Sequence, residues 1–395
     1  MRHTVRNVIN LTRWMRLLFL ICVSAICFAQ PPAGTSNLVY VGTYTDHGSK
    51  GIYYYRFDSK TGQLKPLGLA AETSNPSFLV LDAKRRLLYA ANETDSYKDE
   101  ATGSVSAFAI HEDGKLSLLN QVSSKGPGPA YVTMDRTGKY VLVANYSKGN
   151  IAVFPVLGNG ELGEASAFVQ HKGSSVNADR QSGPHAHAIV LSPDNRFALV
   201  ADLGIDQVLA YPFDASKGAL GQPRITRISP GSGPRHLSFD RSGKFVYLIN
   251  EMRSDITAFS YNPANGALSE LQTTSTLPKD FAGQSTAAEI EVHPSGKFLY
   301  ASNRGHDSIA VFAISESGGK LTPIEYVSTQ GKTPRHFAID PMGKWLLAAN
   351  QDSNNIVIFR INAVSGRLTP NGQVIQIPSP VCIKFLKNAV SKDRR

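Results

Sequence analysis

The sequence predicts an all-β protein, a seven-bladed β-propeller of four-stranded antiparallel blades that is closed by its C-terminal strand. One phrase recurs: an extended run, an Asp-x-x-Gly-Lys turn, an apolar run ending in Ala-Asn, and a second apolar run ending in Phe. Its clearest copies span residues 128–154, 233–259 and 333–359. Short apolar runs joined by tight turns are typical of β-hairpins. No helical period recurs beyond the N-terminal segment, which excludes helical repeats.

The number of blades follows from the residue that closes the second strand of each copy. These residues are Thr43, Asn92, Asn145, Asp202, Asn250, Asn303 and Asn350. Their spacings are 49, 53, 57, 48, 53 and 47 residues, which is the length of one four-stranded blade with its loops. Seven such positions therefore predict seven blades.

The two ends of the repeat array predict how the ring closes. The first copy begins directly with its second strand at residues 38–44, and the segment 380–386 is a strand left over after the seventh copy. Pairing these two strands would complete blade one and remove an open sheet edge. We therefore assign the propeller to residues 37–387, with a short linker at 30–36 and a basic tail at 388–395.

Residues 1–29 have the pattern of a secretory signal peptide. They hold four arginines and no acidic residue, followed by the apolar run 17–28 and the small residue Ala29. The apolar run is shorter than the ~20 residues that a membrane span needs. We expect a periplasmic or secreted protein with no membrane association after cleavage; an uncleaved anchor is the alternative.

Charge and cysteine content narrow the function classes further. The formal net charge of +10 falls to +6 without residues 1–29, because 37 basic residues then face 31 acidic ones. The basic residues are dispersed, whereas a nucleic-acid binder concentrates them in a stripe, so we expect no nucleic-acid partner. Cys22 and Cys27 leave with the signal, and the remaining Cys382 is expected to be a buried, inert thiol. A monomer is expected.

The repeat register predicts a cluster of polar side chains at one mouth of the central channel. Since the first two strands of a blade are antiparallel, the start of the first and the end of the second share one rim. The equivalent first-strand residues are Ser77, Ala130, His187, Arg235, Ala288 and Arg335. The residues that follow the second strands are Tyr44, Glu93, Tyr146, Leu203, Glu251, Arg304 and Gln351.

This set suits acid/base chemistry on an acidic substrate. His187 titrates near neutrality, and Glu251 between arginines stays ionised, so either can serve as the base. Arg235 and Arg304 can bind an oxyanion, a carboxylate or a phosphate. The alternative is a set of salt bridges around a solvated rim.

Several phrases at these positions resemble the seven-bladed lactonase family, over essentially residues 37–387. They are Gly183-Pro-His-Ala-His187, Gly233-Pro-Arg-His236, Ala288-Glu-Ile290, Ser302-Asn-Arg-Gly-His306 and Pro380-Val-Cys382. The family includes bacterial propeller-type 6-phosphogluconolactonases and fungal carboxymuconate-lactonizing enzymes. The resemblance implies a 6-phosphogluconolactonase-like hydrolase acting on a sugar lactone.

The resemblance also assigns roles to residues. His187, Arg235, Glu251 and Arg304 are similar to the functional residues of the muconate branch, and we expect them to be catalytic. Glu289 belongs to a phrase common in the lactonase branch. The expected substrate-binding residues are His185, His236, Glu289, Arg335, Glu93 and Tyr146.

Three alternatives stay open. A lactonizing cycloisomerase would use the same residues, and an exported propeller can also be a non-catalytic binding module. A metal shared by His185 and His187, with His236 and His336 nearby, is disfavoured because three arginines would repel a cation. We expect no metal and no cofactor. An exported enzyme would not meet a cytoplasmic phosphorylated sugar lactone, which leaves the identity of the lactone open.

Overall fold

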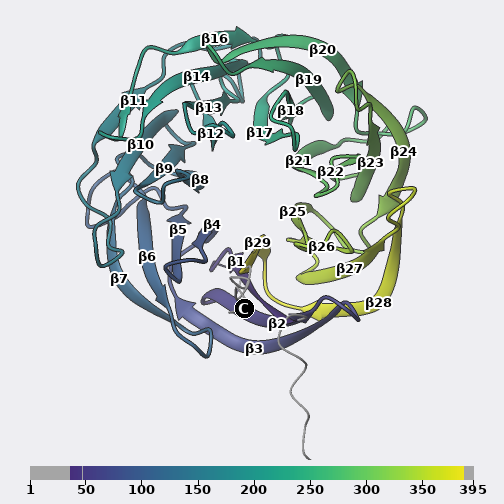
Figure 1. Cartoon of the computed structure of the whole chain (residues 1–395), viewed down its shortest axis with the longest axis horizontal. Helices are drawn as coiled ribbons and strands as arrows, with labels where there is room; N and C mark the ends of the chain where they lie inside the picture. The colour runs from purple at the N-terminus through teal and green to yellow at the C-terminus, as the bar shows by residue number, and fades with distance from the viewer. Residues whose placement is uncertain (1–35, 47, 387–395) are drawn as a thin grey trace, which may run out of the picture. The chain divides into compact units, whose positions relative to one another are not determined.

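The computed structural model describes residues 36–46 and 48–386, and these form seven antiparallel sheets arranged in a ring (Figure 1). The predicted seven-bladed propeller is confirmed. The signal peptide, most of the linker and the basic tail lie outside the described residues. The part of the chain that is described contains no helix long and apolar enough to cross a membrane.

Blade one combines both ends of the array, and the other blades follow in chain order. Blade one contains β1 (Ser36–Thr43), β2 (Gly51–Asp58), β3 (Gln63–Glu72) and β29 (Pro380–Leu386). Blade two contains β4 (Pro76–Asp82), β5 (Leu87–Asn92), β6 (Ser104–Ile110) and β7 (Leu116–Ser123). Blade three contains β8 (Pro129–Met134), β9 (Tyr140–Asn145), β10 (Asn150–Pro155) and β11 (Ala167–Gln170).

Blade four departs from the four-stranded pattern, because a two-residue strand pairs with β14 beside its regular outer strand. It contains β12 (Ala186–Leu191), β13 (Phe197–Asp202), β14 (Gln207–Asp214), β15 (Ala219–Leu220) and β16 (Arg224–Arg227). Blade five contains β17 (Pro234–Phe239), β18 (Phe245–Asn250), β19 (Asp255–Asn262) and β20 (Ala267–Ser275).

The last two blades are regular. Blade six contains β21 (Thr286–Val292), β22 (Phe298–Arg304), β23 (Ser308–Ile314) and β24 (Leu321–Ser328). Blade seven contains β25 (Pro334–Ile339), β26 (Trp345–Asn350), β27 (Asn355–Ile361) and β28 (Leu368–Gln376).

The recurring Asp-x-x-Gly-Lys phrase forms the turn between the first and second strands. The Asp135 carboxylate accepts hydrogen bonds from the backbone N–H groups of Lys139 and Tyr140, at 2.7 and 2.8 Å. Gly138 has a φ of 71°, a left-handed conformation that favours glycine. Asp340 and Gly343 repeat this arrangement in blade seven.

The recurring Asn at the end of the second strand ties neighbouring segments together. The Asn145 side-chain amide donates to the backbone carbonyl of Ser124, which lies just after the outer strand of the preceding blade. Asn350 does the same to Thr329, and Asn303 to Thr276. Each of these asparagines therefore links the inner part of one blade to the end of the blade before it.

Ring closure follows the predicted pairing of the chain ends. β29 pairs antiparallel with β1, from Leu38 opposite Leu386 to Thr43 opposite Pro380. Ile383 is fully buried in a cluster with Val39 and Trp345, which brings blade seven into the seam. Cys382 is buried, as predicted.

An irregularity recurs near the start of every innermost strand. The register of pairing shifts so that at least one residue is left without a partner across the ladder, as at a β-bulge, which redirects a side chain. The residues skipped by the shift include Val381, Ser77, Ala130, His187, Arg235, Ala288 and Arg335. Six of these are the first-strand residues that the repeat register selected, and Val381 is the seventh equivalent.

We expect Ile383→Ala to lower the free energy of unfolding by about 2–5 kcal/mol, because it leaves a cavity in the seam. Urea unfolding followed by tryptophan fluorescence measures this. Val364→Ala is the control, since Val364 is 91% exposed. Equal midpoints for the two variants would show that the seam does not hold the ring together.

Candidate active site at the channel mouth

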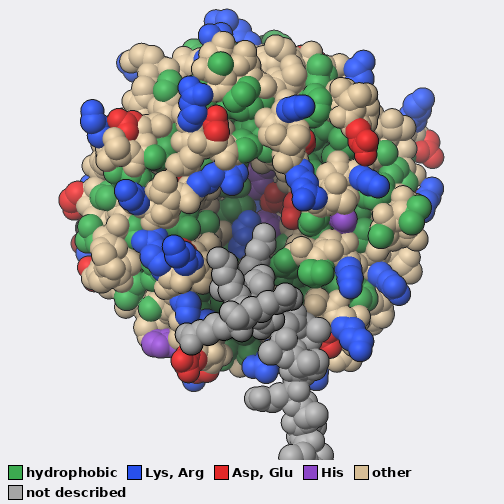
Figure 2. All heavy atoms as spheres, viewed as in Figure 1, with side chains coloured by type: hydrophobic (Ala, Val, Ile, Leu, Met, Phe, Trp, Pro, Cys, Tyr) green, Lys and Arg blue, Asp and Glu red, His purple; other side chains and the backbone are tan. Residues whose placement is uncertain are grey.

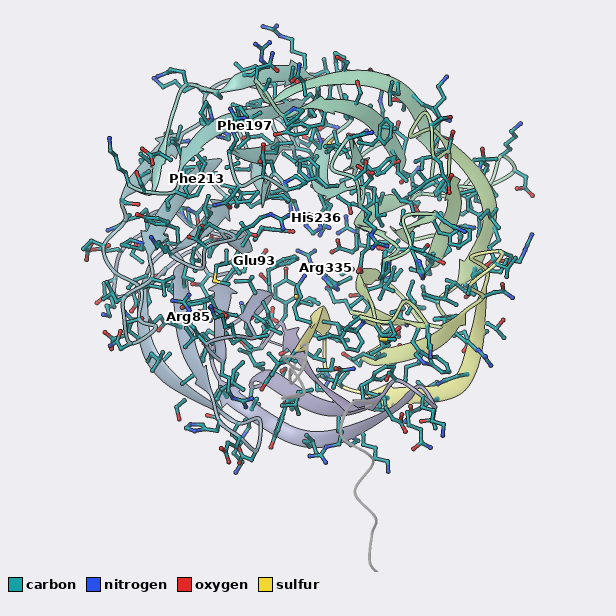
Figure 3. All side chains as sticks on the ribbon, in the orientation of Figure 1. Arg85, Glu93, Phe197, Phe213, His236 and Arg335 are labelled. Carbon is teal, nitrogen blue, oxygen red and sulfur yellow. The ribbon has the colours of Figure 1, made fainter. Side chains whose placement is uncertain are left out.

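The ends of the second strands surround a cavity of about 360 Å³, which we call the mouth cavity. Its lining residues are Tyr44, Glu93, Ala130, Tyr146, Arg180, His187, Glu251, Thr286, Arg304 and Arg335. Figure 2 shows charged side chains and histidines inside the central opening, and in Figure 3 Glu93 and Arg335 point toward the centre of the ring. Six of the ten predicted site residues therefore line one cavity.

Glu251 is the centre of the charge network in this cavity. Its carboxylate accepts a hydrogen bond from Arg180 Nη2 at 2.7 Å and one from Arg235 Nε at 3.1 Å. Arg304 Nη2 lies 3.0 Å from the same carboxylate. A single buried carboxylate thus holds three guanidinium groups from three different segments of the chain.

Burial and these cations act in opposite directions on Glu251. Burial raises the pKa of a carboxyl group, but Arg304 and Arg235 outweigh it and hold the pKa of Glu251 well below its usual range. Burial, together with Arg304 and Arg335, lowers the pKa of Arg235 to about 9, which leaves it protonated at neutral pH. Three positive charges around one negative charge leave the cavity cationic.

His187 is the one histidine among the residues that line the mouth cavity. Burial, with Arg235 and His236 close by, lowers the pKa of His187 well below its ordinary value, so the imidazole is neutral at pH 7. Its ring lies edge-on to Tyr146, with centroids 5.4 Å apart. Within the described part of the chain, His187 Nδ1 and Arg304 Nε are buried nitrogens that have no hydrogen-bond partner. Neither nitrogen is held by a hydrogen bond from the surrounding described residues.

A second group of polar residues, from blades one, two and seven, lines the mouth cavity. Tyr44 donates a hydrogen bond to Glu93 Oε2 at 2.9 Å, and Arg335 Nη2 lies 3.9 Å from Glu93 Oε1. The Arg335 guanidinium also lies over the Tyr44 ring, 5.2 Å from its centroid. Glu93 therefore orients Arg335 at the cavity wall without neutralising the three arginines on the other side.

Three predicted site residues, Arg235, His236 and Glu289, do not line the mouth cavity. Arg235 and His236 line a much smaller cavity, together with His336, and Arg235 is 2% exposed. His236 points into the ring in Figure 3. Glu289 is buried and pairs with both histidines, 3.1 Å from His236 Nδ1 and 3.3 Å from His336 Nε2. The small cavity shares Glu93, Ala130 and Arg335 with the mouth cavity, and we call Arg235, His236, Glu289 and His336 the channel floor.

The floor orients Arg235. The guanidinium Nη1 donates to the backbone carbonyl of Ala288 at 2.6 Å and lies 3.3 Å from the His236 ring nitrogen Nε2. Burial, followed by Arg235, lowers the pKa of His236 well below its ordinary value. Neutral histidines here avoid adding further positive charge beneath the three arginines.

Arg180 was missed by the repeat register, because it lies in the segment 171–185 between blades three and four. The spacing of 57 residues at this blade and the Asp202 that replaces the usual Asn were the available signals. Asp202 accepts hydrogen bonds from the backbone N–H groups of His185 and Gly204, and it pairs with His171 Nδ1 at 2.6 Å. The exceptional Asp thus anchors the segment that carries Arg180.

The remaining predicted residue, His185, lies beside the mouth cavity. Its ring stacks on Tyr146 with centroids 4.6 Å apart, and its Nδ1 lies 2.9 Å from the Tyr146 carbonyl. Among the described residues, no group of three or more His, Cys, Asp and Glu side chains is arranged to hold a metal ion. Leu203 and Gln351, which the register also selected, do not line the mouth cavity.

Comparison with known proteins matches this architecture. The family model described as a seven-bladed β-propeller lactonase matches residues 38–385. The chain belongs to the seven-bladed lactonase family. A relative from Bacillus subtilis (strain 168), named 6-phosphogluconolactonase, is 36% identical over 89% of this chain and 99% of its own.

Two further proteins are similar to this chain over most of its length. A relative from Formosa agariphila, also named 6-phosphogluconolactonase, is 36% identical and covers 76% of this chain and 86% of its own. The solved structure of a periplasmic gluconolactonase from Pseudomonas aeruginosa is 34% identical, with a TM-score of 0.83, over 89% of this chain and 99% of that one.

We expect the buried histidines of the channel floor to make the stability of this protein sensitive to acid. Burial lowers the pKa of His336 to about 3, against the opposing effect of Glu289, whereas an unfolded histidine has a pKa near ~6.5. Between these two pKa values, His336 therefore binds a proton in the unfolded chain but not in the folded protein. We expect His336 to contribute stability above pH ~6.5 and to lose that contribution progressively down to pH ~3.

His336→Gln should reduce the slope of unfolding free energy against pH in this window by about 1.4 kcal/mol per pH unit. Urea unfolding at successive pH values measures the slope. His111→Gln is the control, because His111 is an exposed histidine outside the channel. An unchanged slope in His336→Gln would show that the floor histidine is protonated in the folded protein.

Proposed function

We propose that this protein hydrolyses a sugar lactone at the mouth cavity. The observation that carries the proposal is that a neutral His187 and the guanidinium group of Arg304 line one cavity, which arginines make cationic. A neutral imidazole can accept a proton, and a guanidinium can stabilise negative charge on a carbonyl oxygen. Both groups are needed to open a lactone with water.

In the proposed reaction His187 is the general base. It takes a proton from a water molecule as the water oxygen attacks the lactone carbonyl carbon. The carbonyl oxygen becomes an oxyanion beside Arg304, and the ester C–O bond then breaks. The imidazolium returns its proton to the departing alkoxide, so the enzyme is unchanged and the product is a hydroxy acid. The developing oxyanion favours the charged imidazolium, which offsets the low pKa of His187 in the free site.

Glu251 is assigned to positioning in this proposal. Its strongly lowered pKa makes it a weak base, and its oxygens are occupied by Arg180, Arg235 and Arg304. It holds the arginines in place before the substrate binds, so little reorganisation is needed as charge develops. Arg335, on the opposite wall, is available to bind an acidic group of the substrate.

The substrate is proposed to be an acidic sugar lactone met outside the cytoplasm. The cationic cavity favours a carboxylate or phosphate, and residues 1–29 have the pattern of a secretory signal. The family includes relatives named 6-phosphogluconolactonase and a periplasmic gluconolactonase. Hydrolysis is favoured over cycloisomerisation and over a binding role because these named relatives are lactone hydrolases.

We expect Arg304→Ala to reduce turnover of the best lactone by roughly 100- to 1,000-fold, because one preorganised donor to the oxyanion is lost. His187→Asn should abolish the proton transfer, and Glu251→Gln should release the arginines. Acid release from gluconolactone, its 6-phosphate and a glucarolactone measures turnover.

Arg241→Ala is the matched control, since Arg241 is an exposed residue in the turn at the opposite rim of blade five. It should behave as the wild type. If a lactone is turned over and Arg304→Ala, His187→Asn and Glu251→Gln all fold and keep full turnover, the reaction does not occur in the mouth cavity.

A further inference from the structure

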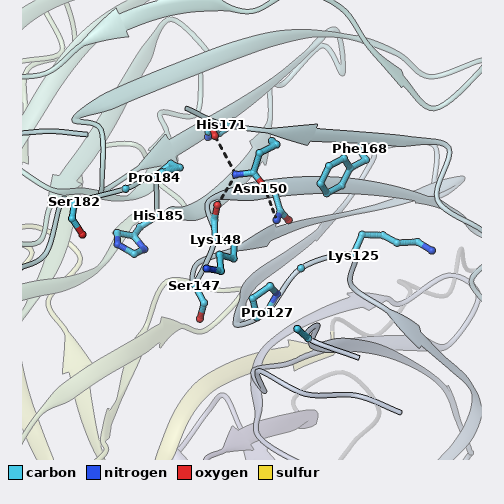
Figure 4. Close-up of a pocket in the computed structure, with 14 residues that line it drawn as sticks. Lys125, Pro127, Ser147, Lys148, Asn150, Phe168, His171, Ser182, Pro184 and His185 are labelled. Carbon is cyan, nitrogen blue, oxygen red and sulfur yellow. Dashed lines mark hydrogen bonds between the residues drawn. The ribbon is translucent and has the colours of Figure 1, made fainter. Parts of the chain in front are cut away.

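A second cavity of about 620 Å³ lies beside the mouth cavity, and we call it the side pocket. It lies between the connection from β7 to β8 and the segment 171–185 that leads to β12. Figure 4 shows Phe168 and Lys125 at one end, Ser182 and His185 at the other, and Lys148 between them. Its volume is in the range of roughly 300 to 1,000 Å³ that is typical of small-molecule sites.

The side pocket shares its wall with the mouth cavity. Tyr146 lines the mouth cavity and the next residue, Ser147, lines the side pocket. In the segment 171–185, Arg180 lines the mouth cavity and Ser182 lines the side pocket. The stacked rings of Tyr146 and His185 form the partition. A molecule longer than one sugar ring could therefore reach from one cavity into the other.

The side pocket lies beside the short outer strand of blade three. The outer strand β11 has four residues, as does β16 in blade four, whereas the outer strands of blades two, five, six and seven have 8, 9, 8 and 9. Alternation along β11 places Phe168 and Gln170 on one face, opposite Ala152 and Asn150 of β10. Phe168 is left 50% exposed there. A large aromatic side chain in a pocket at half exposure presents a ring face to a ligand.

The lining chemistry indicates an anionic carbohydrate. The C–H face of a pyranose ring packs on an aromatic ring, and the hydroxyl oxygens of Ser147 and Ser182 can accept hydrogen bonds from sugar hydroxyl groups. The lining contains two lysines and no carboxylate. Lys125 pairs with the exposed Glu164 at 3.4 Å, but Lys148 makes no ion pair with any described residue. Lys148 is thus available to an acidic group.

We propose that the side pocket binds the second sugar unit of an acidic disaccharide lactone whose lactone ring occupies the mouth cavity. The inference rests on the proposed function and names its substrate class. The second ring stacks on Phe168, its carboxylate pairs with Lys148, and the link between the two rings passes over the Tyr146–His185 partition.

Three substrates separate the contributions: gluconolactone, a glucosyl-gluconic acid δ-lactone and a glucuronosyl-gluconic acid δ-lactone. The acidic disaccharide should have the lowest KM. Phe168→Ala should raise the KM of both disaccharides, relative to that of gluconolactone, by roughly 3- to 10-fold. Lys148→Ala should raise only the KM of the acidic disaccharide, by roughly 2- to 5-fold, and added salt should reduce this difference.

Two matched controls lie outside the side pocket. Leu118→Ala removes a 57% exposed apolar residue from the outer strand of blade two, and Lys172→Ala removes an exposed lysine from the segment 171–185. Neither should change any of the three KM values. Equal KM values for all three substrates, unchanged by Phe168→Ala, would overturn the side-pocket proposal and leave the lactonase proposal standing.

The side-pocket proposal can also be tested if the lactonase proposal fails. If no lactone is hydrolysed, the proposed function fails, and calorimetric titration with the open-chain glucuronosyl-gluconic acid tests the pocket directly. Binding to the wild type that weakens in Phe168→Ala and Lys148→Ala supports an acidic sugar site. The absence of binding to the wild type overturns it.

Discussion

The main-chain hydrogen bonds between β29 and β1 are the interaction on which the rest of this molecule depends. They join the two ends of the described chain into blade one and leave no sheet edge open at the seam. The mouth cavity takes side chains from every blade, from Tyr44 in blade one to Arg335 in blade seven. A small opening at the seam would therefore alter the spacing of all these groups at once.

A repeated backbone irregularity at the start of the innermost strands places side chains at the candidate active site. The innermost strand of each blade shifts register near its start, which redirects at least one side chain per blade. At the equivalent position three blades carry His187, Arg235 or Arg335 and the other four carry a small or apolar residue, while in blade six the shift also leaves Glu289 unpaired across the ladder. Functional asymmetry thus arises by substitution at one equivalent position, while the hydrogen-bonded frame stays the same.

The positive charge of the mouth cavity arises because three buried or half-buried guanidinium groups surround the one carboxylate of Glu251. Removing Glu251 from water is unfavourable, and three guanidinium groups around it outweigh that cost. The excess of positive charge then has no partner within the cavity and favours an acidic ligand. The neutral histidines of the floor keep this excess from growing. The same logic extends to the side pocket, where Lys148 faces no carboxylate.

The sequence by itself determined the seven repeats, the closing strand and the rim on which His187, Glu251 and Arg304 meet, because strand alternation and blade register are properties of local spacing. It did not separate the residues that line the mouth cavity from Arg235, His236 and Glu289, which do not line it, since this division depends on how neighbouring blades pack. It also missed Arg180, whose non-repeating segment is placed by Asp202 and His171. Only the tertiary structure decided these positions, because they depend on contacts between segments that no repeat relates.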